Sequence, residues 1–268
     1  DDRLGYFTTI YQDYTNTLQE TQYVRYINRW HLEKTDKLSQ LSEPVEPIVF
    51  WIENKVPEEF RNAIRDGILG WNKSFEKIGF KNAIVVKQMP DDADWDPADV
   101  RYNTIRWFVQ PGSAYAVGPS RANPFTGELY DADIRISADF VKAFYREFDE
   151  FVDPVTDDEI SKIWEDDPAH NHKHCNYAEH LQSQMSLGWH NLLSQGIVQG
   201  TDDELMDYVY NGLVDLVLHE VGHTLGLRHN FKASSIFTIE QLSNKDFTEQ
   251  YGISGSVMDY HPVSLFDN

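Results

Sequence analysis

The chain has 268 residues and is strongly acidic, with 44 Asp and Glu against 23 Lys and Arg and a formal net charge of −21. This charge repels phosphates, so we expect no nucleic acid among its partners; solubility alone would also explain it. Hydrophobic residues make up 41% of the chain and aromatic residues 13%, which is enough for a packed core. The only cysteine is Cys175, which excludes an intrachain disulfide.

No apolar stretch approaches the roughly 20 residues that are needed to span a bilayer, so we expect no membrane-spanning segment in this chain. The sequence begins Asp-Asp-Arg-Leu, with neither an initiator Met nor a signal peptide. This start favours an internal cut, so we interpret the chain as a processed form or an excised domain of a larger precursor. We expect a monomer.

The first half of the chain alternates between strand and helix patterns. Apolar runs bounded by turn residues predict buried strands, and apolar residues at helical spacing between Pro57 and Gly79 predict one helix. The strands are expected at 48–52, 83–86 and 104–109.

Residues 132–136 alternate between apolar and polar types, as in a half-exposed edge strand, and 140–151 look helical. Residues 153–176 are predicted to be a loop. We therefore expect an α/β or α+β layer with one open edge.

Residues 90–99 form a loop that is dense in carboxylates. Oxygen ligands suit Ca²⁺, so a calcium site is one reading of this loop. The residues do not have the spacing of a known calcium loop, however, and a solvated turn explains them equally simply.

The residues that indicate chemistry lie between 219 and 229, in His-Glu-Val-Gly-His-Thr-Leu-Gly-Leu-Arg-His. The pattern Thr-Asp-Asp-Glu at 201–204 predicts the start of a helix that runs into this segment. His219 and His223 then lie on one face, about 6 Å apart along the helix axis, where both can bind one zinc ion. Glu220 is rotated by about 100° from His219, so it can stand beside the metal and act as general base and acid.

Gly226 is expected to end this helix, because glycine adopts a left-handed conformation at little cost. The resulting turn would bring His229 back as a third ligand. Three protein ligands leave one position for water, which is the arrangement of a catalytic zinc site rather than a structural one.

This segment resembles the extended zinc motif of the metzincin clan of metallopeptidases. The matching residues are His219, Glu220, His223, Gly226 and His229. The clan also has a methionine turn beneath the zinc, and the segment Ser256-Val257-Met258-Asp259-Tyr260 resembles it. The resemblance implies that Met258 is the turn methionine and that Tyr260, like the tyrosine of astacins and serralysins, contacts the metal or stabilises the oxyanion. A buried structural tyrosine is the alternative for Tyr260.

The resemblance also implies a metzincin fold of the α+β class. We expect a twisted, mostly parallel sheet with an antiparallel edge strand, a backing helix, an active-site helix and a small irregular C-terminal lobe. The expected division is an N-terminal extension (1–43), a catalytic lobe with the active-site helix (44–226) and a C-terminal lobe (227–268). Metzincins usually continue further past the methionine turn, so either the C-terminal lobe is truncated or an earlier segment replaces that part.

Within the metzincin clan, the chain resembles a group of bacterial proteins termed Met-zincins. The similar segments are residues 2–9, 26–30, 118–120 and 126–128. This resemblance implies an exported parent protein, in the periplasm, at the cell surface or secreted.

In metzincins an exposed edge strand pairs with the extended substrate, which implies a substrate-binding role for Ala132, Asp133 and Ile134. A plain sheet edge that charged residues keep soluble is the alternative.

His170, His172, His174 and Cys175 form a second group that could bind a metal, although an exposed polar loop explains them as well. Cys175 could also occupy the open zinc position and enforce latency, but nothing in the sequence supplies that geometry.

The resulting prediction is a zinc-dependent endopeptidase that acts on proteins or peptides, with one catalytic Zn²⁺. Two alternatives stay open. One is an inactive zinc-binding scaffold of the same fold, against which the retained Glu220 argues. The other is a metal-dependent hydrolase of a non-peptide bond.

Overall fold

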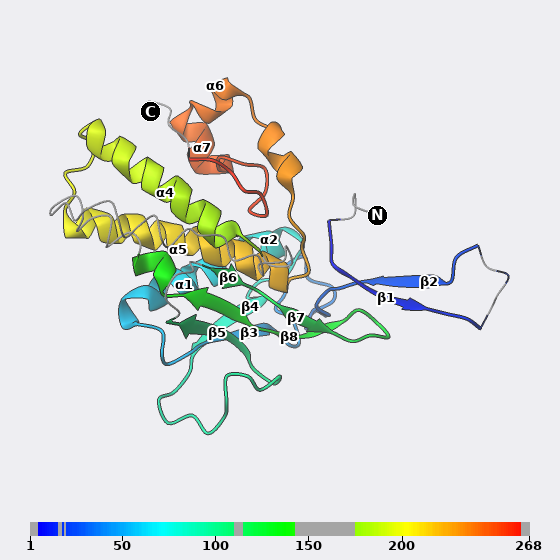
Figure 1. Ribbon diagram of the computed structural model, residues 1–268. Helices are drawn as coiled ribbons and strands as arrows, with labels where there is room; N and C mark the ends of the chain where they lie inside the picture. The colour runs from blue at the N-terminus through cyan, green and yellow to red at the C-terminus, as the bar shows by residue number, and fades with distance from the viewer. Residues whose placement is uncertain (1–4, 16–17, 19, 110–114, 143–174, 264–268) are drawn as a thin grey trace, which may run out of the picture.

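A computed structural model describes residues 5–15, 18, 20–109, 115–142 and 175–263 of the chain (Figure 1). Its centre is a five-stranded sheet in which the first four strands run parallel and the last one runs antiparallel. In order of pairing, the strands are β4 (Ile84–Gln88), β3 (Ile48–Ile52), β5 (Asn103–Phe108), β9 (Ile134–Ser137) and β6 (Ala116–Val117). The strands of the parallel part are rich in Ile and Val, as expected for a sheet with a buried face.

Two helices, α1 (Glu58–Gly70) and α5 (Asp202–Thr224), pack against the sheet, and a third, α4 (Tyr177–Ser194), lies on α5 (Figure 1). Helix α5 packs against α1 and α4 and reaches the sheet at β6 and β9. A Cβ on Gly67 of α1 would lie 2.7 Å from Cβ of Val217, so α1 and α5 approach closely because this position has no side chain. The mixed α+β fold with a mostly parallel sheet is therefore confirmed.

The predicted helix between Pro57 and Gly79 is interrupted at Trp71, where α1 ends and α2 (Asn72–Lys77) begins. Two side-chain contacts hold the chain at this point. The indole N–H of Trp71 donates to the carbonyl of Leu218 over 2.9 Å, and the Asn72 amide bonds both backbone groups of Ile84 over 2.9 Å. Tertiary contacts therefore break a helix that has a continuous apolar pattern.

The expectation that residues 132–136 form an edge strand is wrong. Strand β9 lies inside the sheet, between β5 and β6, and Ile134 is fully buried. The alternation of apolar and polar residues suggested an exposed face, but the polar Asp133 is buried as well. It accepts hydrogen bonds from the N–H and the hydroxyl of Thr104. Ala132 ends β8 (Leu129–Ala132), which pairs with β7 (Ser120–Ala122) in a separate two-stranded sheet, and it is fully buried with its N–H donating to the side-chain oxygen of Asn103.

The N-terminal residues form a hairpin of β1 (Thr8–Gln12) and β2 (Tyr23–Ile27) that projects from the body of the molecule (Figure 1). The start of this segment lies along the chain that follows α5. The N–H of Phe7 donates to the carbonyl of Gly226 over 2.8 Å, and the N–H of Arg228 donates to the carbonyl of Gly5 over 2.9 Å.

The chain after α5 is irregular, with the short helices η2 (Phe231–Ser235), α6 (Ile239–Leu242) and α7 (Lys245–Tyr251). The helix predicted over 140–151 begins before Lys142, and its remainder lies outside the described residues. Within the described ranges, no helix has the length and apolar character that crossing a bilayer requires.

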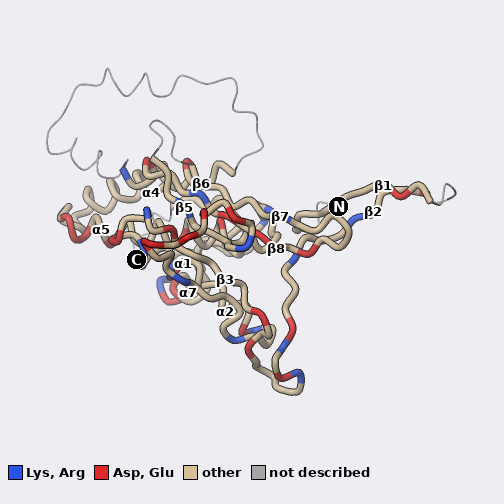
Figure 2. Tube along the Cα trace, turned by 90° about the horizontal axis from the view of Figure 1, so that it is seen from below, with Lys and Arg blue, Asp and Glu red and all other residues tan. Residues whose placement is uncertain are grey.

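Acidic residues are spread over several elements rather than gathered in one patch (Figure 2). In the acidic loop at 90–99, Asp96 accepts a hydrogen bond from the N–H of Ala98, and Asp99 binds the guanidinium of Arg101. These contacts are those of a solvated turn. Among the described residues, the loop does not belong to the cluster of His, Cys, Asp and Glu that could hold a metal.

Candidate metal centre

Helix α5 brings His219 and His223 to the site, and its start is the predicted one. Thr201 caps the helix through a capping box with Glu204, which satisfies the free N–H groups of the first turn. The apolar residues of α5 are buried against α1, α4 and the sheet, so the helix is anchored along its length. Near its C-terminal end His219 is fully buried and His223 nearly so.

The chain turns back directly after this helix, at Gly226. Its φ of +96° is left-handed, and a Cβ there would lie 2.2 Å from the carbonyl oxygen of Asn28. The N–H of Leu227 donates to the carbonyl of Gly222 over 3.0 Å, and the N–H of Gly226 donates to that of His223 over 2.9 Å. This pair of bonds is the Schellman motif, which satisfies the last carbonyls of a helix. The predicted glycine turn is therefore present.

The turn returns His229 to the two helical histidines. The Nε2 atoms of His223 and His229 are 3.1 Å apart, and the ligand atoms of His219, His223, His229 and Cys175 all lie within 4.8 Å of one another. Two nitrogens on a tetrahedral zinc ion with normal bond lengths are about 3.3 Å apart. The donor set fits a zinc ion.

Backbone carbonyls hold the helical imidazoles in the orientation that a metal requires. Nδ1 of His219 donates to the carbonyl of Val257 over 2.7 Å, and Nδ1 of His223 donates to that of Leu227 over 2.9 Å. Each bond places the proton on Nδ1 and leaves the Nε2 lone pair free to bind a metal. Burial also lowers the pKa of His219 to about 2 and that of His229 to about 4, so both rings are neutral, as ligands must be.

Glu220 is fully buried beside these imidazoles, and neither carboxylate oxygen has a hydrogen-bond partner among the described residues. Burial raises the pKa of Glu220 to about 8. The thiol of Cys175 and the N–H of Gly118 partly offset this rise, although neither forms a hydrogen bond of normal geometry with the carboxylate. A Cβ on Gly118 would lie 2.5 Å from the carbonyl oxygen of Glu220, so only glycine lets this chain pass so close to the helix. An unpaired buried carboxyl beside a metal site is unusual outside functional sites.

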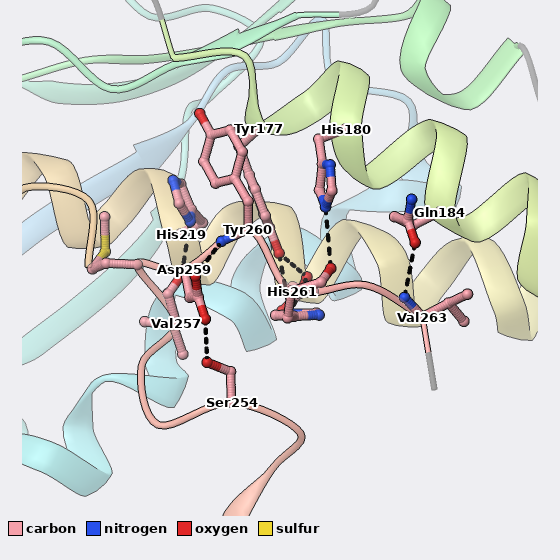
Figure 3. A network of polar contacts seen from close by, with 12 residues as sticks. Tyr177, His180, Gln184, His219, Ser254, Val257, Asp259, Tyr260, His261 and Val263 are labelled. Atoms are coloured by element: carbon pink, nitrogen blue, oxygen red, sulfur yellow. Dashed lines mark hydrogen bonds and ion pairs between the residues drawn. The ribbon is translucent and has the colours of Figure 1, made fainter. Parts of the chain in front are cut away.

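The segment that resembles the methionine turn lies under the helix (Figure 3). A Cβ on Gly222 would lie 2.2 Å from Sδ of Met258, which shows that the methionine packs directly on the helix backbone. Asp259 is 1% exposed and holds the turn: it accepts hydrogen bonds from the hydroxyls of Ser234 and Ser254 over 2.5 and 2.6 Å.

Tyr260 follows this turn and points into the site. Its ring lies edge-on to His229, with centroids 4.8 Å apart, and its hydroxyl accepts a hydrogen bond from the N–H of Asn176 over 3.0 Å. The hydroxyl is also 3.3 Å from Sγ of Cys175. Its predicted catalytic role remains a prediction.

Tyr177 was not among the expected site residues, yet it lies in the centre of the site. It is fully buried and stacks on His219, with centroids 3.9 Å apart and an angle of 13° between the rings. Its hydroxyl donates to Asp215, which also forms an ion pair with His261 over 3.7 Å. Tyr177 and His261 belong to one network of polar contacts in Figure 3.

Cys175 is the second residue of the site whose position the sequence did not predict. Its Sγ lies 3.5 Å from Nε2 of His219 and 3.4 Å from Nε2 of His229. Burial, followed by the charge of Glu220, raises the pKa of its thiol to about 12. Cys175 thus belongs to the main site, whereas His170, His172 and His174, which the sequence grouped with it, lie outside the described residues.

Comparison with known families agrees with the sequence resemblance in the C-terminal part of the chain. Residues 201–267 match a family model described as Met-zincin, and residues 1–35 match one described as a domain of unknown function. The first match contains every residue of the zinc motif and the methionine turn, so the resemblance to a metzincin-type zinc metallopeptidase family is confirmed there. No curated protein and no solved structure matches the chain.

Proposed function

We propose that this protein is a zinc-dependent endopeptidase. The supporting observation is the convergence of three imidazoles on one point, with the unpaired carboxyl of Glu220 buried next to them. His219, His223 and His229 would hold the metal. Zinc at this position supplies Lewis acidity toward a peptide carbonyl and lowers the pKa of water.

The proposed roles of the chain's own groups follow from their positions. Glu220 is fully buried beside the imidazoles, so it can take up a proton from the attacking water and return it to the leaving amine. The hydroxyl of Tyr260 lies 3.3 Å from Sγ of Cys175, next to the imidazole cluster, and can donate to a developing oxyanion.

The proposed place of the substrate differs from the one that the sequence suggested. Since β9 is inside the sheet, we propose that an extended peptide pairs with β6, the antiparallel edge strand next to α5. β6 leads into Gly118, which touches the backbone of Glu220, so a peptide along this edge would pass beside the proposed general base.

Cleavage of unfolded proteins and peptide libraries by the zinc-loaded protein tests this function. We expect Glu220→Gln to keep about one zinc per chain, measured by elemental mass spectrometry, and to lose at least about 100-fold in cleavage rate, as usual for a missing general base. A chelator should abolish cleavage by the wild type. Cleavage at the wild-type rate by Glu220→Gln would refute the proposed role of this residue.

An inactive zinc protein is the second candidate, and one observation favours it. The thiol of Cys175 stands where a fourth ligand would, and structural zinc sites have four protein ligands. The buried and unpaired Glu220 favours the enzyme, because a closed structural site has no use for that carboxyl. Zinc at one equivalent, without cleavage by the wild type or by Cys175→Ala, would favour the scaffold.

A further inference from the structure

We propose that Cys175 is the fourth ligand of the metal that the three histidines hold, so that the chain closes its own site. This inference rests on the proposed zinc site and deepens it. In the closed state the thiolate occupies the position that water needs, and the protein binds zinc without cleaving peptides. Cleavage then requires Cys175 to leave the metal.

The distances around Sγ carry the assignment. With normal bond lengths, sulfur and nitrogen on one tetrahedral zinc ion are about 3.5 Å apart, since Zn–S is about 2.3 Å and Zn–N about 2.0–2.1 Å. Sγ of Cys175 is 3.5 Å from Nε2 of His219 and 3.4 Å from Nε2 of His229. With the 3.1 Å between the Nε2 atoms of His223 and His229, three of the six separations within a Cys-His₃ set are close to those expected for a tetrahedral ion, and all six are within 4.8 Å.

The backbone next to Cys175 is fixed to the site at two consecutive residues. The N–H of Asn176 donates to the hydroxyl of Tyr260 over 3.0 Å, and the buried Tyr177 stacks on His219. Tyr177 also begins α4, whose inner face packs on α5. The thiol is therefore held in place by its neighbours rather than resting at the site by its own contacts alone.

Glu220 provides an independent observation that points to a cation. Both its carboxylate oxygens lack a hydrogen-bond partner among the described residues, although the side chain is fully buried next to the thiol. Two acidic groups that share a buried pocket can ionise together only where a positive charge compensates them. A divalent ion among the imidazoles would supply that charge to both.

Alkylation of the thiol tests the assignment without any cleavage assay. Cys175 is the only cysteine of the chain, so the mass increase with iodoacetamide reports on this residue alone. At free zinc about 100 times above its Kd, we expect labelling to slow by about 100-fold, because only the metal-free protein exposes a free thiol. Removal of the metal with a chelator should restore the rate. Equal rates with and without zinc would overturn the proposal.

Substitution of zinc by cobalt distinguishes a bond between the metal and Cys175 from protection of the thiol by a fold that the metal makes more rigid. A cobalt-loaded wild type should show a thiolate-to-cobalt charge-transfer band in the near ultraviolet, and Cys175→Ala should bind cobalt without this band. The same variant should lose more than about tenfold in zinc affinity, since the loss of even an outer-shell partner typically costs that much. Protection from alkylation without a charge-transfer band would overturn the proposal.

Cleavage assays then distinguish this inference from the proposed function. Faster cleavage by Cys175→Ala than by the wild type supports both. A charge-transfer band with no cleavage by either protein supports the ligand assignment and refutes the peptidase. Cleavage by the wild type at the rate of Cys175→Ala, with no band, refutes the ligand assignment and leaves the peptidase standing. A double variant, Cys175→Ala with Glu220→Gln, is the matched control for activity that comes from a contaminant.

Discussion

The ring of His219 is held from two sides by segments of very different kinds. On one side, the carbonyl of Val257 in the methionine turn accepts the proton of Nδ1. On the other side, Tyr177 at the start of α4 stacks on the ring. The hydrogen bond fixes which nitrogen faces the metal, and the stacking fixes the plane of the ring. Four changes test how much each side contributes to the stability of the fold and to zinc binding.

Asp259→Ala should have the largest effect, because it removes the centre of the methionine turn. The hydroxyls of Ser234 and Ser254 and the N–H of Tyr260 would lose their common acceptor. We expect the free energy of unfolding of the metal-free protein to fall by about 4 kcal/mol in urea denaturation. Asp259→Asn keeps one carbonyl acceptor and should lose about half as much. An Ala variant as stable as the wild type would mean that the turn does not depend on this carboxylate.

Tyr177→Ala tests the other side. Loss of a fully buried aromatic ring should cost about 3 kcal/mol in the same assay and weaken zinc binding, since His219 would gain freedom to rotate. Tyr177→Phe is the matched control, because it keeps the stacked ring and loses only the contacts of the hydroxyl with Asp215 and His261, worth about 1 kcal/mol. If the Phe variant weakened zinc binding as much as the Ala variant, the hydroxyl and not the stacking would hold the ring.

Gly222→Ala probes the contact between the turn and the helix. The added Cβ would lie 2.2 Å from Sδ of Met258, so the methionine must move, at a cost of about 2 kcal/mol. Thermal unfolding with and without zinc measures this effect. Met258→Leu keeps the volume and should cost less than about 1.5 kcal/mol, with little change in zinc affinity, because the sulfur is packing and not a ligand. A large loss of zinc by the Leu variant would contradict that role.

The smallest expected effect is a pH dependence of the free energy of unfolding that arises from His261. This residue follows the methionine turn and shares Asp215 with Tyr177, so it connects the two sides. Burial opposes its charged form, but Asp215 outweighs burial and raises the pKa of His261 above its usual value. A raised pKa stabilises the fold fully below the unfolded-state value of about 6.5, and this contribution is lost as the pH rises through the folded-state pKa. We expect the free energy of unfolding to fall by less than about 1 kcal/mol as the pH rises over this range, and Asp215→Asn should abolish this fall. Urea denaturation across this pH range would reveal it; a stability that increases there would contradict the assignment.

The sequence was sufficient for the groups whose positions depend on local geometry. His219, His223 and Glu220 follow from helical spacing, and the left-handed turn at Gly226 follows from the freedom of glycine. The methionine turn was found because its residues are consecutive.

The groups that depend on distant packing could not be found in this way. Helix α4 was not predicted, although its buried residues Leu181, Met185 and Trp189 are four apart, which is a signal of a helix. Without that helix, nothing placed Tyr177 on His219 or Cys175 beside the imidazoles. The edge strand was misassigned for a similar reason, because Asp133 is buried against Thr104 of another strand.

The pairing of Gly5 and Phe7 with Gly226 and Arg228 has a practical consequence. The two segments that family models recognise separately, 1–35 and 201–267, are joined by backbone hydrogen bonds at the bend that carries the third histidine. A recombinant fragment that starts after the hairpin would keep every motif residue and still lose the strand against which the bend is ordered. Expression boundaries for this protein are therefore better chosen from the fold than from the motif.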